Sequence, residues 1–310
     1  MSQVVQGRPG RKSGPRPTET KKLVVHGYWW WALPALSAIL AIHYIATGVG
    51  LMYSFTDYEG IGDFNWVGLD NYAKILDDTD VTSSIGNTFF IAIFSFVLTN
   101  VIGLLLALAL NRGLKTRYLL RTLLFLPVIL STIAVSYIFR FIFYIEGPIN
   151  QFLIAIGQPD LQKTWLADAT WSIWVILIVV VWQNIGFAMV IYLAGLATVP
   201  QELEEAAAID GAGVWRRFRS VTVPMLQPAI AVSTTLSIIQ GMKIFDQVVA
   251  MTGGGPFGAT ETLSTQIYHK TFEFMQYGYG SAISMVFTVV ILMLALIQSY
   301  LTRDRSGMNK

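Results

Sequence analysis

Long apolar stretches alternate with short polar segments along the chain after residue 27. Six of these stretches are long enough to cross a bilayer, which takes about 20 apolar residues in a helix. They cover residues 28–53, 84–110, 119–143, 171–196, 228–251 and 282–301. Because lipid offers backbone N–H and C=O groups no hydrogen-bond partners, each stretch is predicted to be a helix. The pattern therefore predicts an all-α integral membrane protein with six transmembrane helices.

The composition supports a membrane protein. Charged residues make up 13% of the 310 residues, against roughly 25% in soluble domains. An ordinary soluble enzyme, a disordered chain and a fibrous repeat are thereby excluded. The chain has no cysteine, which excludes a disulfide, a zinc–thiolate site and a thiol nucleophile. Its three histidines are scattered, so we predict no metal site, and no catalytic residue stands out.

The charged residues predict the orientation in the membrane. Residues 1–27 are basic and rich in proline and glycine, which predicts a disordered cytoplasmic tail. Segment 111–121 and the second tail, 302–310, are also basic, whereas loop 54–83 carries seven acids against Lys74 alone. Since basic loops stay in the cytoplasm, both termini are predicted to be cytoplasmic, on either side of a transmembrane domain at 28–301.

The predicted cytoplasmic loop 198–225 has the pattern of two short helices. Pro200 suits the first turn of a helix, and the acids and alanines of 202–208 favour its continuation. Gly211 is predicted to end that helix in a left-handed conformation. A second helix starts at about Val214, with one face formed by Trp215, Phe218 and Thr222. An amphipathic element of this kind suits either a groove in a partner protein or the lipid headgroups, and both uses remain open.

The same loop resembles the EAA signature of bacterial ABC importer permeases. The matching residues are Glu205-Ala206-Ala207, Gly211, Val221 and Val223-Pro224. The family prefers Ile and Leu where this chain has the two valines. A second stretch, residues 243–256 followed by Thr260, Tyr268, Phe272 and 278–282, resembles the carbohydrate-importer branch related to the maltose permeases. The resemblance extends from the first to the sixth predicted span.

The resemblance implies a type I ABC importer permease in a bacterial cell membrane. Its implied partners are a second permease, two ATPase subunits and an extracytoplasmic sugar-binding protein, with no nucleic acid. The residues implied to dock into the ATPase are Glu205, Ala206, Ala207, Asp210, Gly211 and Ala212. The chain has no G-x-x-x-x-G-K-[S/T] loop. We therefore expect no cofactor in this chain and expect ATP–Mg to be bound by the partner ATPase.

Polar residues within the fourth and fifth spans are candidates for the substrate pathway, because such groups tend to face a cavity. They are Gln183, Asn184, Ser237, Gln240, Lys243 and Asp246. In the related maltose permease the sugar contacts come from these two helices. The resemblance assigns such contacts to Asn184, Phe187, Ser237, Gly241 and Ile244, although Gly241 and Ile244 lack the family's polar side chains.

Structural roles compete with these assignments. Gln183, Asn184 and Asn100 have the chemistry of interhelical hydrogen-bonding residues. Lys243 and Asp246, three residues apart, have the spacing to neutralise each other.

Two other functions compete with the permease. A polytopic membrane enzyme needs a cluster of acids, histidines or a metal, and the acids at 57–80 lack metal-ligand spacing. A self-contained carrier or channel is disfavoured by the absence of an internal repeat.

Overall fold

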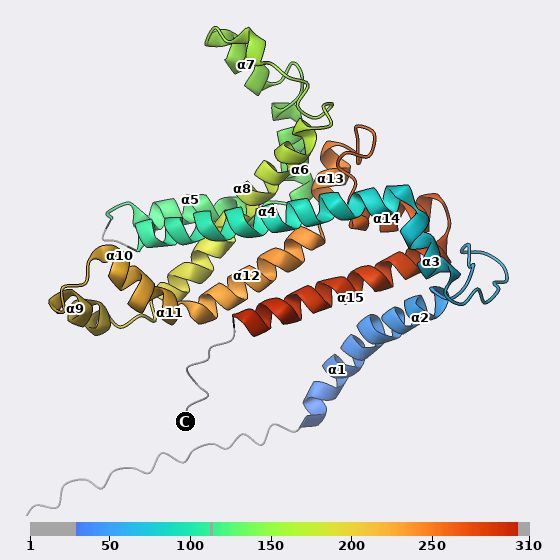
Figure 1. Ribbon diagram of the computed structural model, residues 1–310, viewed down its shortest axis with the longest axis horizontal. Helices are drawn as coiled ribbons and strands as arrows, with labels where there is room; N and C mark the ends of the chain where they lie inside the picture. Colours follow the sequence, from blue (N-terminus) through green and yellow to red (C-terminus); the bar gives the residue numbers. More distant parts are fainter. Residues whose placement is uncertain (1–28, 112–113, 303–310) are drawn as a thin grey trace, which may run out of the picture. The chain divides into compact units, whose positions relative to one another are not determined.

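The computed structural model describes residues 29–111 and 114–302. The predicted tail 1–27, and all but the first residue of the tail 302–310, lie outside the described residues. The chain divides into two units, residues 1–47 and 48–310, which are described separately. Figure 1 gives the order of the helices.

The first apolar stretch is helical, as predicted. It consists of η1 (Trp29–Ala32), α1 (Leu33–Ile39), η2 (Leu40–Ile45) and α2 (Ala46–Tyr53), the last of which continues into the second unit. The 24 residues Trp30–Tyr53 are long and apolar enough to cross a membrane.

Four long helices form the body of the second unit: α4 (Thr79–Leu110), α8 (Trp171–Leu196), α12 (Gln227–Met242) and α15 (Tyr277–Leu301). Helix α4 packs against α8 and α12, and α12 also packs against α15 (Figure 1). Helix α8 begins and ends at the residues predicted for the fourth span, 171 and 196. Where α12 packs against α4, a Cβ on Gly241 would lie 2.8 Å from the Cα of Ala92, so only glycine permits this packing.

Two predicted spans are broken, so the expectation of continuous helices over 119–143 and 228–251 was wrong. The third consists of α5 (Arg117–Ile129) and α6 (Thr132–Ile142), which are bent by 98°. The fifth contains α12, a break at 243–245 and α13 (Asp246–Met251). Another bend, of 72°, separates α12 from the preceding segment Val214–Met225. Counting each bent pair as one span, the described residues contain up to six spans, as predicted.

Side chains from other helices bind backbone groups at both breaks. Pro127 has no N–H to donate within the last turn of α5. Just beyond it, the carbonyl of Leu130 accepts a hydrogen bond from Gln183 Nε2 at 3.3 Å. At the second break the carbonyl of Ile244 accepts one from Thr262 Oγ1 at 3.1 Å. Irregular backbone at membrane depth is tolerated where protein satisfies it or where it lines a cavity.

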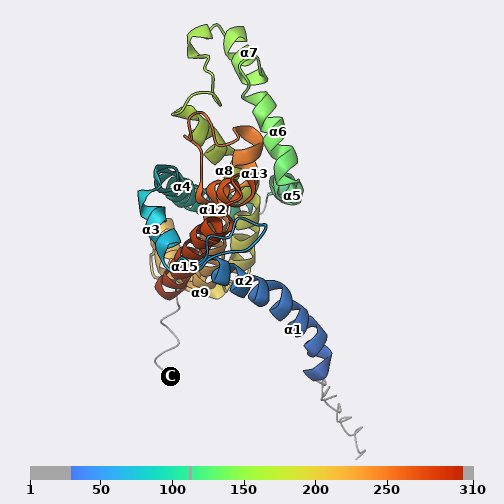
Figure 2. The same cartoon turned by 90° about the vertical axis from the view of Figure 1, so that its right-hand side faces the viewer.

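The shorter helices occupy the connections. Between α2 and α4 lies α3 (Asp70–Asp77), and beyond α6 lie α7 (Pro148–Ala155) and η3 (Pro159–Leu161). In both views α7 lies apart from α12 and α15 (Figures 1 and 2). Between α8 and α12 the chain forms α9 (Gln201–Ile209), α10 (Val214–Arg217), η4 (Phe218–Thr222) and α11 (Val223–Met225), and before α15 it forms α14 (Leu263–Tyr268) and η5 (His269–Glu273).

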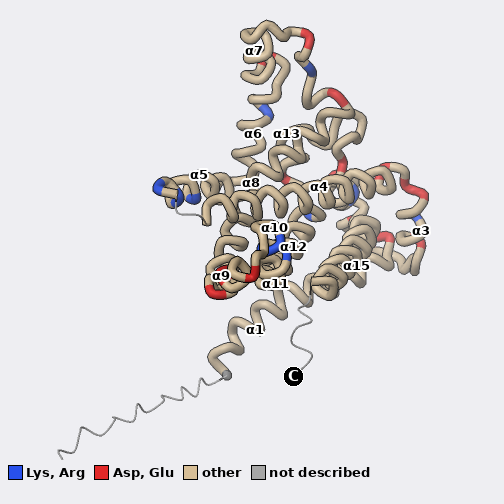
Figure 3. The backbone as a smooth tube through the Cα atoms, turned by 60° about the vertical axis from the view of Figure 1, so that its left-hand side comes forward, with Lys and Arg blue, Asp and Glu red and all other residues tan. Residues whose placement is uncertain are grey.

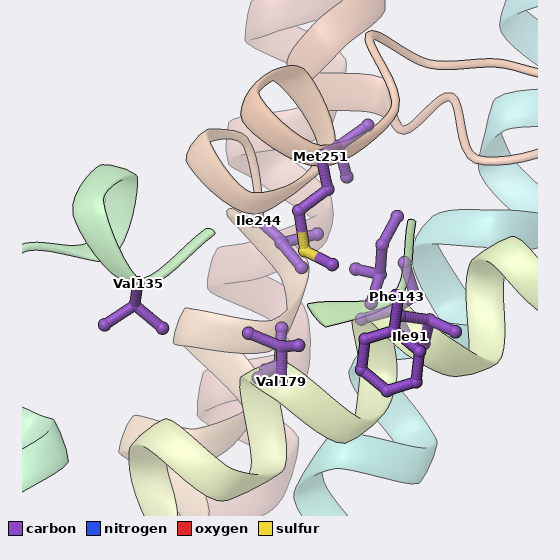
Figure 4. Packing of buried hydrophobic residues seen from close by; sticks show 10 residues of the cluster. Ile91, Val135, Phe143, Val179, Ile244 and Met251 are labelled. Carbon is purple, nitrogen blue, oxygen red and sulfur yellow. The ribbon is translucent and has the colours of Figure 1, made fainter. Parts of the chain in front are cut away.

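One apolar cluster joins α4, α6, α8 and α13. Figure 4 shows Ile91, Val135, Val179, Ile244 and Met251 of this cluster. Van der Waals packing of these buried side chains holds α13 and the broken third span against α8, since lipid tails provide no hydrophobic driving force between spans. Residue 244, the centre of the second break, is therefore anchored.

The carboxylate of Asp78, just before α4, links the first turns of α4 and α15 to η5. Asp78 Oδ1 accepts hydrogen bonds from the N–H groups of Asp80 and Val81, at 3.1 and 3.3 Å, and so caps α4. Its Oδ2 lies 2.8 Å from Lys270 Nζ and accepts a hydrogen bond from Tyr279 Oη at 3.0 Å. Burial raises the pKa of Asp78, but the hydrogen bonds from Lys270, Val81 and Tyr279 together lower it below its ordinary value of 3.8.

We therefore expect Asp78→Asn to lower the free energy of unfolding by about 1–3 kcal/mol, because Lys270 loses its closest anion. Since the folded pKa lies below the unfolded one, this contribution is complete above about pH 4 and is lost as the pH falls through the folded pKa. Thermal unfolding of the detergent-solubilised protein at pH 7 measures the effect. Asp77→Asn removes the same charge from an exposed neighbour and is the control; equal midpoints for the two variants would contradict this role of Asp78.

Candidate functional site

A cavity of about 470 Å³ lies where α8 faces the break between α12 and α13. Its walls combine amide, charged and apolar side chains from α8, from the end of α5, from the start of α6 and from residues 239–247. Such a mixture of apolar walls and a few polar groups is typical of small-molecule sites.

Most of the predicted pathway residues lie around this cavity. Those in its lining are Gln183, Asn184, Gln240, Lys243, Ile244 and Asp246. Ser237 and Gly241 line a smaller pocket that shares Asn184 and Gln240 with the first. Phe187 is in the lining of neither. The structure thus brings together all the predicted positions except Phe187, and their roles stay predictions.

The two amides of α8 differ in their hydrogen bonds. Gln183 is 5% exposed, and its Oε1 is buried without a hydrogen-bond partner among the described residues. Asn184 Nδ2 donates to the carbonyl of Val180 at 2.8 Å, within its own helix. A buried acceptor with no partner is costly, and this one belongs to a residue in the wall of the cavity.

The two charged residues of the cavity do not pair. No ion pair within 4.0 Å joins Lys243 to Asp246, although both are described. The competing structural role, in which the two residues neutralise each other, is therefore not the one that the structure shows. The break at 243–245 changes the helical geometry on which the three-residue spacing depends. Both charged groups remain available to a molecule in the cavity.

Asn100 has the interhelical role that the sequence left open. Its Oδ1 accepts hydrogen bonds from Tyr192 Oη of α8 at 2.8 Å and from Ser233 Oγ of α12 at 2.7 Å. Gln183 also bonds across helices, to Leu130. Gly241 and Ile244 have packing roles as well, since Gly241 permits the contact with α4 and Ile244 is 4% exposed in the core.

Thr132 and Gln247 line the cavity and were missed. Gln247 follows Asp246 directly, so its place in the same polar stretch was a usable signal. The sequence around Thr132 gave no such signal, because Thr132 reaches the cavity only through the sharp bend between α5 and α6.

The segment from α9 to α11 has the predicted helix–turn–helix form. Gly211 has a φ of +78°, which confirms the predicted left-handed end of α9. The Gly211 N–H donates to Ala208 and the Ala212 N–H to Ala207, the pattern of a Schellman cap. Pro200 precedes the helix as its N-cap and is not in the first turn, a shift of one residue from the prediction.

The predicted docking residues fall on two sides of this segment. Glu205, Ala206, Asp210 and Gly211 are exposed. Ala207 and Ala212 are half-buried, where α9 meets the second helix. They line a cavity of about 230 Å³ within the segment. Of the predicted set, the four exposed residues are therefore those that a partner could contact.

The two arms of the segment carry opposite charges. Acids lie on α9, whereas Arg216, Arg217 and Arg219 follow the turn (Figure 3). The arms are joined where Thr222 Oγ1 donates to Glu204 Oε1 at 3.1 Å. Trp215 and Phe218 lie together, with ring centroids 5.6 Å apart.

Comparison with known proteins gives consistent matches. Residues 99–307 match the family described as binding-protein-dependent transport system inner membrane component. The chain is 32% identical to the probable starch degradation products transport system permease protein AmyD of Thermoanaerobacterium thermosulfurigenes, over 92% of this chain and 97% of that protein. It is 34% identical to the trehalose/maltose transport system permease protein MalF of Thermococcus litoralis, over 88% and 92%.

The fold also has a match among solved structures. A chain of a bacterial ABC transporter involved in the import of the acidic polysaccharide alginate has a TM-score of 0.78. The alignment covers 90% of this chain and 96% of that chain, at 22% sequence identity. At this identity the likeness concerns the fold alone.

Proposed function

This chain belongs to the family of binding-protein-dependent transport system inner membrane components, and we propose that it is the permease subunit of an ATP-driven importer of a sugar or short oligosaccharide. The named relatives transport starch degradation products and trehalose or maltose. The chain is a membrane component with several spans and not the ATPase of its system. Family membership disfavours the membrane enzyme and the self-contained carrier.

The cavity at the break of the fifth span carries this proposal. Amide groups of Gln183, Asn184 and Gln240 suit the hydroxyl groups of a sugar, which both donate and accept hydrogen bonds. Lys243 and Asp246 add a donor and an acceptor that are not committed to each other. Substrate sites of transporters commonly lie at interrupted helices near the middle of the membrane. The cavity would form half of the pathway, and a second permease would supply the other half.

The α9–α11 segment would couple transport to ATP hydrolysis. In the proposed complex the exposed end of α9, with Glu205, Ala206, Asp210 and Gly211, docks into a cytoplasmic ATPase. Ala207 and Ala212 lie on the inner side of the turn, where they line the cavity within the segment. Two ATPase subunits would bind ATP–Mg, and an extracytoplasmic binding protein would deliver the sugar. The small exposed side chains allow a partner surface to approach the backbone closely.

Both termini are proposed to be cytoplasmic. Within the second unit, lysines and arginines gather at the start of α5 and near α10, whereas acids mark α3 (Figure 3). The positive-inside rule then places α10 in the cytoplasm and α3 outside.

Replacing Asn184 by Leu should lower the maximal rate of sugar uptake by about three- to tenfold, the effect of one lost hydrogen bond, while leaving the complex assembled. Thr288→Val is the matched control. Thr288 also donates to the carbonyl four residues earlier, at 2.8 Å, but is exposed on α15 and outside the cavity. The measurement is sugar uptake by the two variants and the wild type, in cells or proteoliposomes at equal protein levels. Unchanged kinetics for Asn184→Leu would assign that residue to helix packing.

Gly211→Val should greatly reduce the ATPase activity stimulated by the loaded binding protein, because a left-handed conformation costs a non-glycine residue about 1–2 kcal/mol. Gly213→Val is the control, since Gly213 has a φ of −63° and open space around it. Both variants should reach the membrane at wild-type levels. Wild-type stimulation and uptake in the Gly211→Val complex would remove the docking role from this turn.

The orientation is tested with cysteines, because the chain has none of its own. An Asp63→Cys variant should react with an impermeant maleimide in intact cells, and an Arg216→Cys variant only after permeabilisation. Both positions are exposed. The reverse pattern of labelling would invert the proposed topology.

A further inference from the structure

A groove of about 700 Å³ lies between the basic arm of the α9–α11 segment, α10 with η4, and the C-terminal end of α4. Leu196 of α8 and Glu204 of α9 also line it. Leu104, Leu105 and Leu108 of α4 line one side, and Trp215 and Phe218 line the other. This volume is within the roughly 300–1,000 Å³ typical of sites for small molecules. The groove is separate from the cavity at the α12–α13 break and from the Gly211 turn.

One wall of the groove continues the lipid-facing surface. Leu105 is 60% exposed on α4, one of the helices long and apolar enough to span the membrane. Trp215, on the opposite side, is 71% exposed. Tryptophan is enriched at the level of the lipid headgroups, where its ring is partly in apolar surroundings. The groove therefore has the position and the lining expected where an acyl chain meets its headgroup.

The polar end of the groove holds an arginine without a partner. Arg217 lines the groove, and its Nε is buried with no hydrogen-bond partner among the described residues. Glu204, the acid in the lining, accepts a hydrogen bond from Thr222 and forms no ion pair with Arg217. A buried guanidinium donor left unpaired is costly. An anion from outside the chain would satisfy it.

We propose that this groove binds an anionic phospholipid of the cytoplasmic leaflet, with its phosphate on Arg217 and one acyl chain along Leu104 and Leu108. The choice of leaflet rests on the proposed orientation of the permease. Arg216 and Arg219 are exposed beside Arg217 and add to the positive potential that attracts anionic headgroups. The apolar walls favour a lipid over free phosphate, which would use only the polar end.

The two uses that the sequence left open for this loop then belong to different arms. The acidic arm, α9 with its Gly211 turn, contacts the ATPase. The basic arm, α10 with η4, holds lipid against the end of α4. A bound lipid would brace the second arm at the membrane surface, beside the first arm that docks into the ATPase.

The test uses the purified importer complex in phosphatidylcholine nanodiscs, without ATP, sugar or binding protein. A photoreactive phosphatidylglycerol is titrated in, and the crosslinked peptides are identified by mass spectrometry. Crosslinks should map to α4 and α10. Arg217→Gln should weaken binding at least about tenfold, the loss of a charge-assisted hydrogen bond. The control Arg219→Gln removes the same charge from an exposed position outside the groove and should change binding by less than about twofold.

Two more variants keep the test decisive if Arg217→Gln fails to assemble with the ATPase. Leu108→Trp should fill the apolar part of the groove and weaken lipid binding with the arginine intact. Arg217→Lys should keep most of the binding through its charge.

Several outcomes would overturn the proposal. Equal losses for Arg217→Gln and Arg219→Gln would indicate a diffuse charge effect. Competition by inorganic phosphate at lipid-like concentrations would indicate a simple anion site. A photoreactive residue introduced at position 105 should crosslink to lipid. Crosslinks from it to the second permease or the ATPase, in place of lipid, would assign the groove to a subunit contact. Since no transport step is measured, failure here leaves the proposed sugar import untouched, and failure of sugar uptake leaves the lipid result standing.

Discussion

The fold of this protein depends on one constraint: every backbone N–H and C=O within the membrane needs a hydrogen-bond partner from the protein, because lipid provides no such partner. Unbroken helices such as α8 meet it within themselves. At 130–131 and 243–245 the helices stop, and the protein supplies partners from elsewhere: Gln183 bonds Leu130, and Thr262 bonds Ile244. These two breaks border the same cavity. The irregular backbone therefore lies beside the cavity that we propose as the sugar site.

Much of the fold could be predicted from the sequence because the hydrophobic signal is long and periodic. The fourth span matched residue for residue, and the helix–turn–helix after it was expected from an alanine run and a glycine. The bend of 98° within the third span was not expected, because a proline such as Pro127 is also tolerated in continuous transmembrane helices. The break depends on contacts from distant helices, which a local pattern does not contain.

The site residues, like the helices, could be predicted where local sequence decides and not where tertiary contacts decide. Polarity within an apolar run identified Asn184 and Gln240 as cavity residues. The interhelical role that the sequence offered for Asn100 is confirmed by its hydrogen bonds to α8 and α12. Thr132 could not be predicted, because its position follows from the bend between α5 and α6. Lys243 and Asp246 line the cavity as predicted, and the competing ion pair between them does not form, because residues 243–245 are not helical. Residue type therefore indicated where polar groups are needed, and tertiary geometry decided which of them meet an empty space.

The amide oxygen of Asn100 has a mechanical consequence. One atom accepts hydrogen bonds from α8 and α12 while its own residue belongs to α4. Any sliding of one of these helices past another would break at least one bond in surroundings that offer no replacement. This favours motion of α4, α8 and α12 as one rigid body. Because burial holds residue 244 in the apolar cluster with α4, α6, α8 and α13, the second helix break would move with this body.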